Sequence, residues 1–182
     1  MTTRQPRHLI YVNYRDQHYV GSRAQPEGHG SLWHEEGEVL ANVVADTPGN
    51  WLEIGAERGS STRYIILGLR LSRVVYSVDI RHQLDETIPG RVRIDADSRR
   101  LMPSGVVVGA FIDGAHDYWS VVNDIGVALR WGASTLVFHD TTPTPGPGIE
   151  VRQAVLDHLL PEMWEIEDIQ TKCGMIVARR KS

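Results

Sequence analysis

Apolar strand-like segments that alternate with helix-like segments constrain the fold of this chain most strongly. Seven segments are predicted to be strands, over residues 50–55, 73–80, 91–97, 105–114, 134–140, 164–169 and 174–180. Helices are predicted over residues 31–46, 60–70, 118–130 and 149–160. This alternation predicts an α/β, doubly wound, mostly parallel seven-stranded sheet with helices on both faces. The last two strands are joined too closely for a crossover helix, so they are predicted to form an antiparallel hairpin at one edge.

Length and composition are those of one globular domain that has a small net charge and too few cysteines for an intrachain disulfide. The chain has 182 residues, of which 41% are hydrophobic, and a formal net charge of −4. That charge does not favour a nucleic-acid partner. A single cysteine, the absence of a secretory-type apolar start and the absence of a long apolar run lead us to expect a cytoplasmic protein that does not enter membranes. We expect residues 1–30 to form an N-terminal arm and residues 31–182 to form one domain.

Acidic residues end five of the predicted strands. In an open parallel sheet, ligands bind beyond the carboxyl ends of the strands. The acidic residues at these ends are Glu53, Asp79, Asp95 with Asp97, Asp113 and Asp140. The sequence therefore predicts a carboxylate-lined ligand site along one edge of the sheet.

The segment "WLEIGAERGSST", residues 51–62, has the form of a ligand-binding turn between a strand and a helix. A Walker-type phosphate loop needs a lysine here, and the two lysines of the chain are Lys172 and Lys181. A dinucleotide loop needs a glycine where this chain has Glu57, whose side chain and charge oppose a pyrophosphate. The pattern is therefore unfavourable for a phosphorylated cofactor, although a tight turn alone also explains Gly55 and Gly59.

A cationic cofactor with a ribose suits an acidic edge better. S-adenosylmethionine carries a sulfonium, an ammonium group and a ribose diol, and it has no phosphate. Asp79, at the end of the second strand, is suited to accept hydrogen bonds from the diol. Glu53 and the glycine turn would then serve the amino-acid end of the donor.

Three segments resemble class I S-adenosylmethionine-dependent methyltransferases. "LEIGAERGSST" is similar to the first motif of that superfamily, "YSVDI" to its acidic second-strand end and "DADS" to its third-strand segment. The resemblance implies a Rossmann-like fold, with Asp97 and Ser98 beside the adenine. The donor-binding residues that it implies are Glu53, Gly55, Ala56, Gly59, Ser60, Ser61, Asp79, Ile80, Asp97, Ser98 and Asp113.

A longer stretch, residues 111–140 followed by "PGIEVRQAV", is similar to O-methyltransferases that act on macrolide sugars, of the macrocin and mycinamicin type, and to the cephalosporin-biosynthesis group. This resemblance implies natural-product biosynthesis, a hydroxyl of a small polyhydroxylated acceptor, and a divalent ion, usually Mg²⁺. The implied metal ligands are Asp113, His139 and Asp140. Asp113 and His116 are the implied catalytic residues, with His116 as the general base.

His139 departs from the pattern of the macrolide-sugar enzymes, which have an acidic residue at this position. Imidazole suits softer divalent ions better than Mg²⁺, which prefers oxygen ligands. Three alternatives remain open: a softer ion, a weakly held ion completed by water, or no metal. His139 is also consistent with a hydrogen-bonded strand end, and His116 with a helix cap.

Two other functions are compatible with these residues. The first is a metal-dependent hydrolase that uses Asp113, His116, His139 and Asp140, and the second is a non-catalytic protein that keeps the cofactor site. The chain carries little extra sequence for an acceptor site. We therefore expect residues 1–45 or a second copy of the chain to cover the site, which predicts a homo-oligomer.

Overall fold

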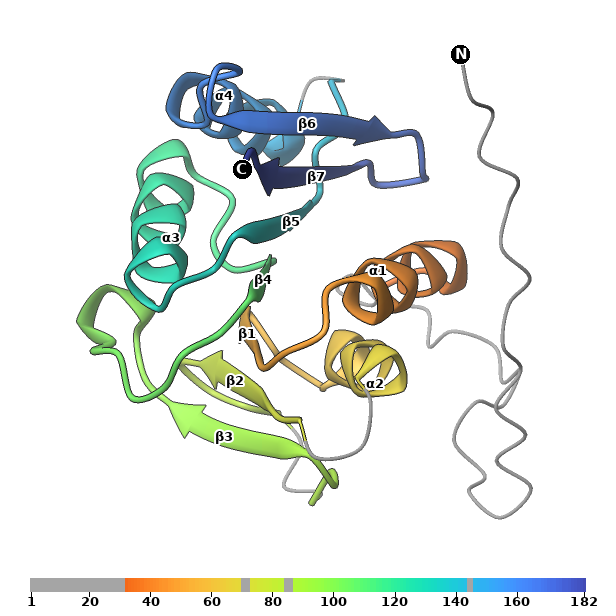
Figure 1. Cartoon of the computed structure of the whole chain (residues 1–182), viewed down its shortest axis with the longest axis vertical. Coiled ribbons are helices and arrows are strands. Elements are labelled where there is room, and N and C mark those ends of the chain that lie inside the picture. The colour runs from red at the N-terminus through yellow and green to blue at the C-terminus, as the bar shows by residue number, and fades with distance from the viewer. Residues whose placement is uncertain (1–31, 70–72, 84–86, 144–145) are drawn as a thin grey trace.

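A single mixed sheet of seven strands organises the protein, as seen in a computed structural model that describes residues 32–69, 73–83, 87–143 and 146–182. The strands are β1 (Trp51–Ile54), β2 (Val75–Asp79), β3 (Arg91–Asp95), β4 (Gly109–Ile112), β5 (Thr135–His139), β6 (Trp164–Ile169) and β7 (Met175–Arg180). Their order in the sheet is β3-β2-β1-β4-β5-β7-β6 (Figure 1). The first five strands are parallel, and β7 is antiparallel to both β5 and β6. The predicted fold and edge hairpin are confirmed.

Within the described residues, four helices cover the two faces of the sheet. They are α1 (His34–Asp46), α2 (Ser60–Gly68), α3 (Tyr118–Arg130) and α4 (Pro147–His158), and a short 3₁₀ turn, η1 (Ser98–Arg100), follows β3. Figure 1 shows α1 and α2 together on one side of the sheet, and α3 and α4 on the other. The protein therefore has three layers, with the sheet between two pairs of helices.

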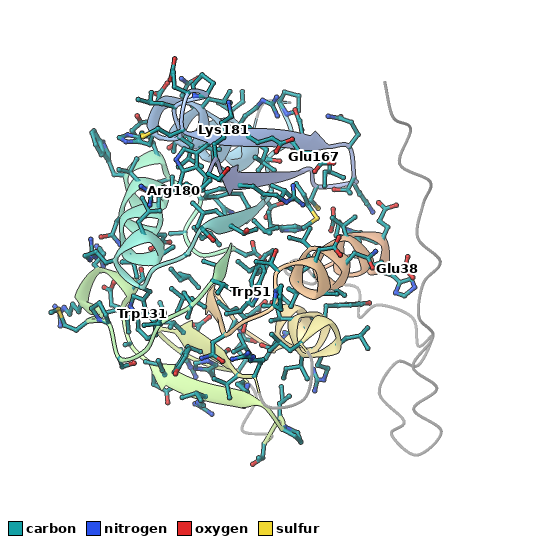
Figure 2. The ribbon with its side chains drawn as sticks, viewed as in Figure 1. Glu38, Trp51, Trp131, Glu167, Arg180 and Lys181 are labelled. Carbon is teal, nitrogen blue, oxygen red and sulfur yellow. The ribbon has the colours of Figure 1, made fainter. Side chains whose placement is uncertain are left out.

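Each face of the sheet has its own apolar core. Trp51, Phe111 and Val137 pack with α1 and α2, whereas Ile112 and Phe138 belong to the core beneath α3 and α4. Figure 2 shows Trp51 on the side of α1 and α2, and Trp131 on the opposite side. Strands β1, β4 and β5 are buried throughout, which explains why their sequences are almost continuously apolar.

Several predicted boundaries differ from the structure, most clearly those of the first helix and the fourth strand. Helix α1 begins at His34, because the Glu36 side chain accepts a hydrogen bond from the Trp33 amide and caps the first turn. The segment 105–114 forms a strand only at Gly109–Ile112, since the Val107 and Val108 amides donate to carbonyls outside the sheet. Ser31, a capping type of residue at the start of the helix predicted over 31–46, lies outside the described residues, as does the arm predicted at 1–30.

Among the described helices, none combines the length and apolar character needed to cross a membrane.

Candidate functional site

The acidic residues predicted at the strand ends lie at one edge of the sheet. Residues Ile54 and Ile112 pair in parallel register, as do Ile112 and Phe138, so the residues that follow β1, β4 and β5 are neighbours. Asp79 and Asp95 are paired at the ends of β2 and β3. The edge consists of two adjoining parts: the turn that follows β1, and a cluster of histidines and carboxylates beyond β4 and β5.

Glu53 lies beneath the first turn and is fully buried. Its carboxylate accepts hydrogen bonds from the hydroxyls of Ser61 (2.6 Å), Thr62 (2.7 Å) and Ser77 (2.7 Å). Burial raises the pKa of Glu53, and the three hydroxyl hydrogen bonds lower it by less. Glu53 therefore connects the start of α2 to β1 and β2 and supports the turn from below.

Asp79 holds the turn from the side. Its Oδ2 accepts a hydrogen bond from the Glu57 amide at 2.8 Å, and its Oδ1 accepts one from the Arg81 amide at 2.8 Å. Each carboxylate oxygen still has a second acceptor position. The Glu57 side chain accepts a hydrogen bond from Gln83, and its backbone has a positive φ of 40°. Ala56 is buried within this turn, and Ser60 begins α2.

The segment after β3 carries the predicted adenine-side residues. Asp97 accepts hydrogen bonds from the backbone and guanidinium of Arg99, which lower its pKa to about 2. The Ser98 side chain contacts the buried Asp124 on α3. Ile80, just past β2, is 78% exposed. Asp97 and Ser98 are thus held by contacts within the chain, whereas Ile80 presents an apolar surface.

Two histidines and two carboxylates converge beyond β4 and β5. His116 Nε2 lies 3.4 Å from an oxygen of Asp113 and 3.3 Å from one of Asp140. His139 Nδ1 lies 3.4 Å from each of the same two oxygens. Both carboxylates therefore lie between the two imidazole rings. Asp117 provides the N-cap of α3, so capping does not explain His116.

The charges of this cluster shift the pKa values of both histidines. The hydrogen bond with Asp113 raises the pKa of His116 and burial lowers it, while the charge of Asp140 adds to the increase, so the net pKa lies above 6.5. Burial lowers the pKa of His139, but Asp113, Asp140, Cys173 and Glu36 together raise it far more. The cluster is thus a strongly negative environment that favours cations.

Glu36 is a member of the cluster that the sequence reasoning missed. It lies on α1, is fully buried, and its Oε2 is 2.9 Å from His139 Nε2. Its Oε1 accepts a hydrogen bond from the Cys173 amide at 2.8 Å. An acidic residue in the first turn of a helix is ordinarily a favourable charge at the surface, and Glu36 instead lies on the buried face of α1.

Local backbone geometry brings the two parts of the site together. A Cβ atom built on Gly55, whose φ is +90°, would lie 1.9 Å from the carbonyl oxygen of Asp113. Asp140 has a positive φ of 52°, an unusual conformation that aspartate tolerates better than most residues. Strained backbone of this kind concentrates at functional sites.

Two groups of side chains in the described part of the chain have the spacing to hold a metal ion. One is Asp113, His139 and Asp140, and the other is Glu36, His139 and Cys173, with ligand atoms within 4.8 Å of one another in each group. His139 Nδ1 is buried and has no hydrogen-bond partner, because neither 3.4 Å approach has hydrogen-bond geometry. This buried nitrogen has no partner and faces two carboxylates, so the first group is suited to a divalent cation.

Comparisons with known proteins identify the fold. No protein-family profile and no curated protein sequence matches the chain. Similar solved structures include the O-methyltransferase from Bacillus cereus in complex with SAH, which has a TM-score of 0.64 and 16% identity, covering 85% of this chain and 84% of that one. Another is the O-methyltransferase TomG from Streptomyces achromogenes, involved in tomaymycin synthesis, in complex with SAM. Its TM-score is 0.66, with 15% identity over 84% of this chain and 82% of that one.

A third similar structure is the SAH-bound methyltransferase PaMTH1 from Podospora anserina, with a TM-score of 0.63 and 14% identity. The match covers 84% of this chain and 80% of that one. At these identities the likeness concerns the fold. The chain therefore has the Rossmann-like fold found in these methyltransferases.

Proposed function

We propose that this protein is an S-adenosylmethionine-dependent O-methyltransferase that uses a divalent ion and acts on a hydroxyl of a small polyhydroxylated acceptor. One observation carries this proposal. Asp113, His116, His139 and Asp140 form a compact acid–imidazole cluster beside the turn after β1, at the edge where this fold binds ligands. The bound SAM and SAH of similar structures support the choice of donor.

The turn after β1 is proposed to bind the donor. The free acceptor positions on Asp79 suit the ribose diol. The glycine turn is proposed to serve the amino-acid end of the donor. Glu53 acts from beneath, because its carboxylate is occupied by three hydroxyls. Its role is therefore to hold the turn and the start of α2 rather than to contact the donor.

Asp113, His139 and Asp140 are proposed to hold the ion. When bound, a divalent ion lowers the pKa of a coordinated hydroxyl and orients it. The two carboxylates also neutralise positive charge that gathers at the site. Both remain partly exposed, with side chains 21% and 32% accessible, whereas the His139 side chain is only 6% accessible. The open side of the cluster is thus formed by the two carboxylates and by His116, whose side chain is 31% accessible.

His116 is proposed to take the proton of the acceptor hydroxyl at Nδ1, because Nε2 donates to the Asp113 carboxylate. The oxygen then forms a bond to the donor methyl carbon while the carbon–sulfur bond breaks, leaving S-adenosylhomocysteine and the methyl ether. Alignment of oxygen, carbon and sulfur accounts for much of the acceleration in such a displacement. A positioned base adds about 10²- to 10⁴-fold.

The test measures donor binding and turnover separately. Calorimetry with S-adenosylmethionine is expected to show binding to the wild type, to Asp113→Asn and to His116→Ala. Formation of S-adenosylhomocysteine with diol-bearing sugars and glycosylated natural products is expected only for the wild type, with each variant at least about 100-fold slower. A wild type that does not bind the donor contradicts the proposal and favours a hydrolase, and fully active variants contradict the roles of Asp113 and His116.

A further inference from the structure

The proposed methyl transfer does not explain the burial of Glu36 or its contact with His139. It is completely buried and lies on a helix that precedes the first strand, yet it contacts the histidine at the end of β5. Burying a carboxylate is costly unless it is fully hydrogen-bonded or paired. The contacts of Glu36 therefore indicate what it does to His139.

The partners of Glu36 determine the direction of its hydrogen bond with the imidazole. The Trp33 amide donates to Oε2 at 3.0 Å and the Cys173 amide donates to Oε1 at 2.8 Å. Backbone amides can only donate, so both oxygens act as acceptors. Since both oxygens already accept from backbone amides, the 2.9 Å contact between Oε2 and His139 Nε2 is a hydrogen bond that the imidazole donates.

With a proton fixed on Nε2, the other ring nitrogen is the one available to bind a ligand. Nδ1 is buried, has no hydrogen-bond partner and faces the carboxylates of Asp113 and Asp140. A histidine that binds a metal through one nitrogen commonly donates the other N–H to a carboxylate, which sets the tautomer and increases the basicity of the ligand.

We propose that Glu36 is a positioning residue that holds the Nε2 proton of His139, so that Nδ1 joins Asp113 and Asp140 in a site selective for divalent transition-metal ions over Mg²⁺. The inference rests on the metal dependence in the proposed function. One imidazole nitrogen with two carboxylates suits Mn²⁺, Fe²⁺, Co²⁺ or Zn²⁺, whereas Mg²⁺ prefers oxygen ligands and retains water.

Glu36→Gln and Glu35→Gln form a matched pair of variants. Glutamine keeps the shape of Glu36, but two backbone amides and the imidazole N–H then compete for one carbonyl oxygen, and the negative charge is lost. Glu35 is the adjacent residue, also joins α1 to the β6–β7 turn through the Lys172 amide, and is exposed. The control therefore removes a similar bond from the same helix without removing a contact to His139.

Metal binding is measured without turnover. Metal-free protein is titrated with Co²⁺ and followed by visible absorption, with and without a large excess of Mg²⁺. The wild type and Glu35→Gln are expected to bind Co²⁺ with the same spectrum and to retain it against Mg²⁺. Glu36→Gln is expected to bind Co²⁺ about 10- to 100-fold more weakly, with a changed spectrum. Equal affinity and an equal spectrum for Glu36→Gln overturn the proposal, as does displacement by Mg²⁺.

A second measurement applies if Glu36→Gln does not fold. The wild type labelled with ¹⁵N-histidine and loaded with Zn²⁺ is expected to show one ring that carries its proton on Nε2 and has a metal-shifted Nδ1. The reverse assignment overturns the proposal, and so does a sulfur-to-cobalt absorption band, which would place the ion on Cys173. Wild type that binds S-adenosylmethionine in calorimetry but no Co²⁺ contradicts this inference and leaves the donor site standing, whereas Co²⁺ binding without donor binding contradicts the proposed methyl transfer alone.

Discussion

Glu53 shows how one buried carboxylate makes stability depend on pH. Its folded-state pKa lies above the ordinary value of 4.5, because burial outweighs the three hydroxyl hydrogen bonds. The folded protein therefore retains this proton to a higher pH than the unfolded chain does. Stability from this group is full below about pH 4.5 and falls as the pH rises through the raised pKa.

Glu53→Gln is predicted to remove that decline, because an amide has no charge to bury. Relative to the wild type, the variant should become more stable, with a larger free energy of unfolding, as the pH rises above 4.5. Urea unfolding at a series of pH values measures this difference. Glu165→Gln, at an exposed position on β6, is the control and should follow the wild type. Parallel curves for Glu53→Gln and the wild type would contradict the assigned shift.

The sequence placed Glu53 correctly at a strand end but did not indicate its contacts. An apolar run followed by a glycine turn predicts where β1 ends, because local periodicity and turn chemistry determine that boundary. Ser61 was predicted to bind the donor, whereas Thr62 and Ser77 had no predicted role. That the three hydroxyls meet one carboxylate depends on how α2 packs over β1 and β2, which no local pattern contains.

A second prediction concerns the turn between β1 and α2. At Gly55 a side chain would both strain the backbone and collide with the Asp113 carbonyl. Gly90 has a similar φ, +85°, but a Cβ there would meet its nearest atom at 3.8 Å. Gly90→Ala is expected to cost about 1–2 kcal/mol from its backbone conformation alone. Gly55→Ala should cost clearly more, because β1 and β4 must separate.

Chemical denaturation of the two alanine variants measures the comparison, and calorimetry with S-adenosylmethionine measures its effect on the site. We expect Gly55→Ala to weaken donor binding and Gly90→Ala to leave it unchanged. Equal losses of stability would mean that the chain relaxes around the Asp113 carbonyl without cost.

At the level of elements, periodicity predicted every strand and helix of the described chain, but the ends of some were wrong. Residues 105–108 are apolar apart from Gly105 and precede β4, so the sequence could not distinguish an irregular segment from a strand. The start of α1 was displaced because Ser31 is a suitable capping residue by type, whereas Glu36 caps the helix from within. Apolar composition indicates which segments tend to be buried, whereas the pairing of strands depends on neighbours that are distant in sequence.

The complete fold brings together residues that no local sequence pattern connects. His139 and Cys173 both contact Glu36, which lies more than 100 positions earlier in the chain. The alternation of strands and helices predicted the sheet and its ligand edge, because those follow from general rules of α/β folds. It did not predict that α1 would pack beside β5 and β7, because a helix before the first strand has no sequence signal for the strand end that it covers.

Donor and ion are predicted to stabilise the whole fold through separable residues. A ligand that binds only the folded chain at 100 times its dissociation constant adds about 2.7 kcal/mol of stability. For a domain of this size that corresponds to an increase in Tm of roughly 5–10 °C. S-adenosylmethionine and Co²⁺ should each produce such an increase in the wild type. In Asp113→Asn the donor should still raise Tm, because the turn after β1 and Asp79 are unchanged, whereas the increase with Co²⁺ should disappear. Glu165→Gln should retain both increases, and a Co²⁺ effect that persists in Asp113→Asn would mean that the stabilising ion binds outside the Asp113, His139 and Asp140 cluster.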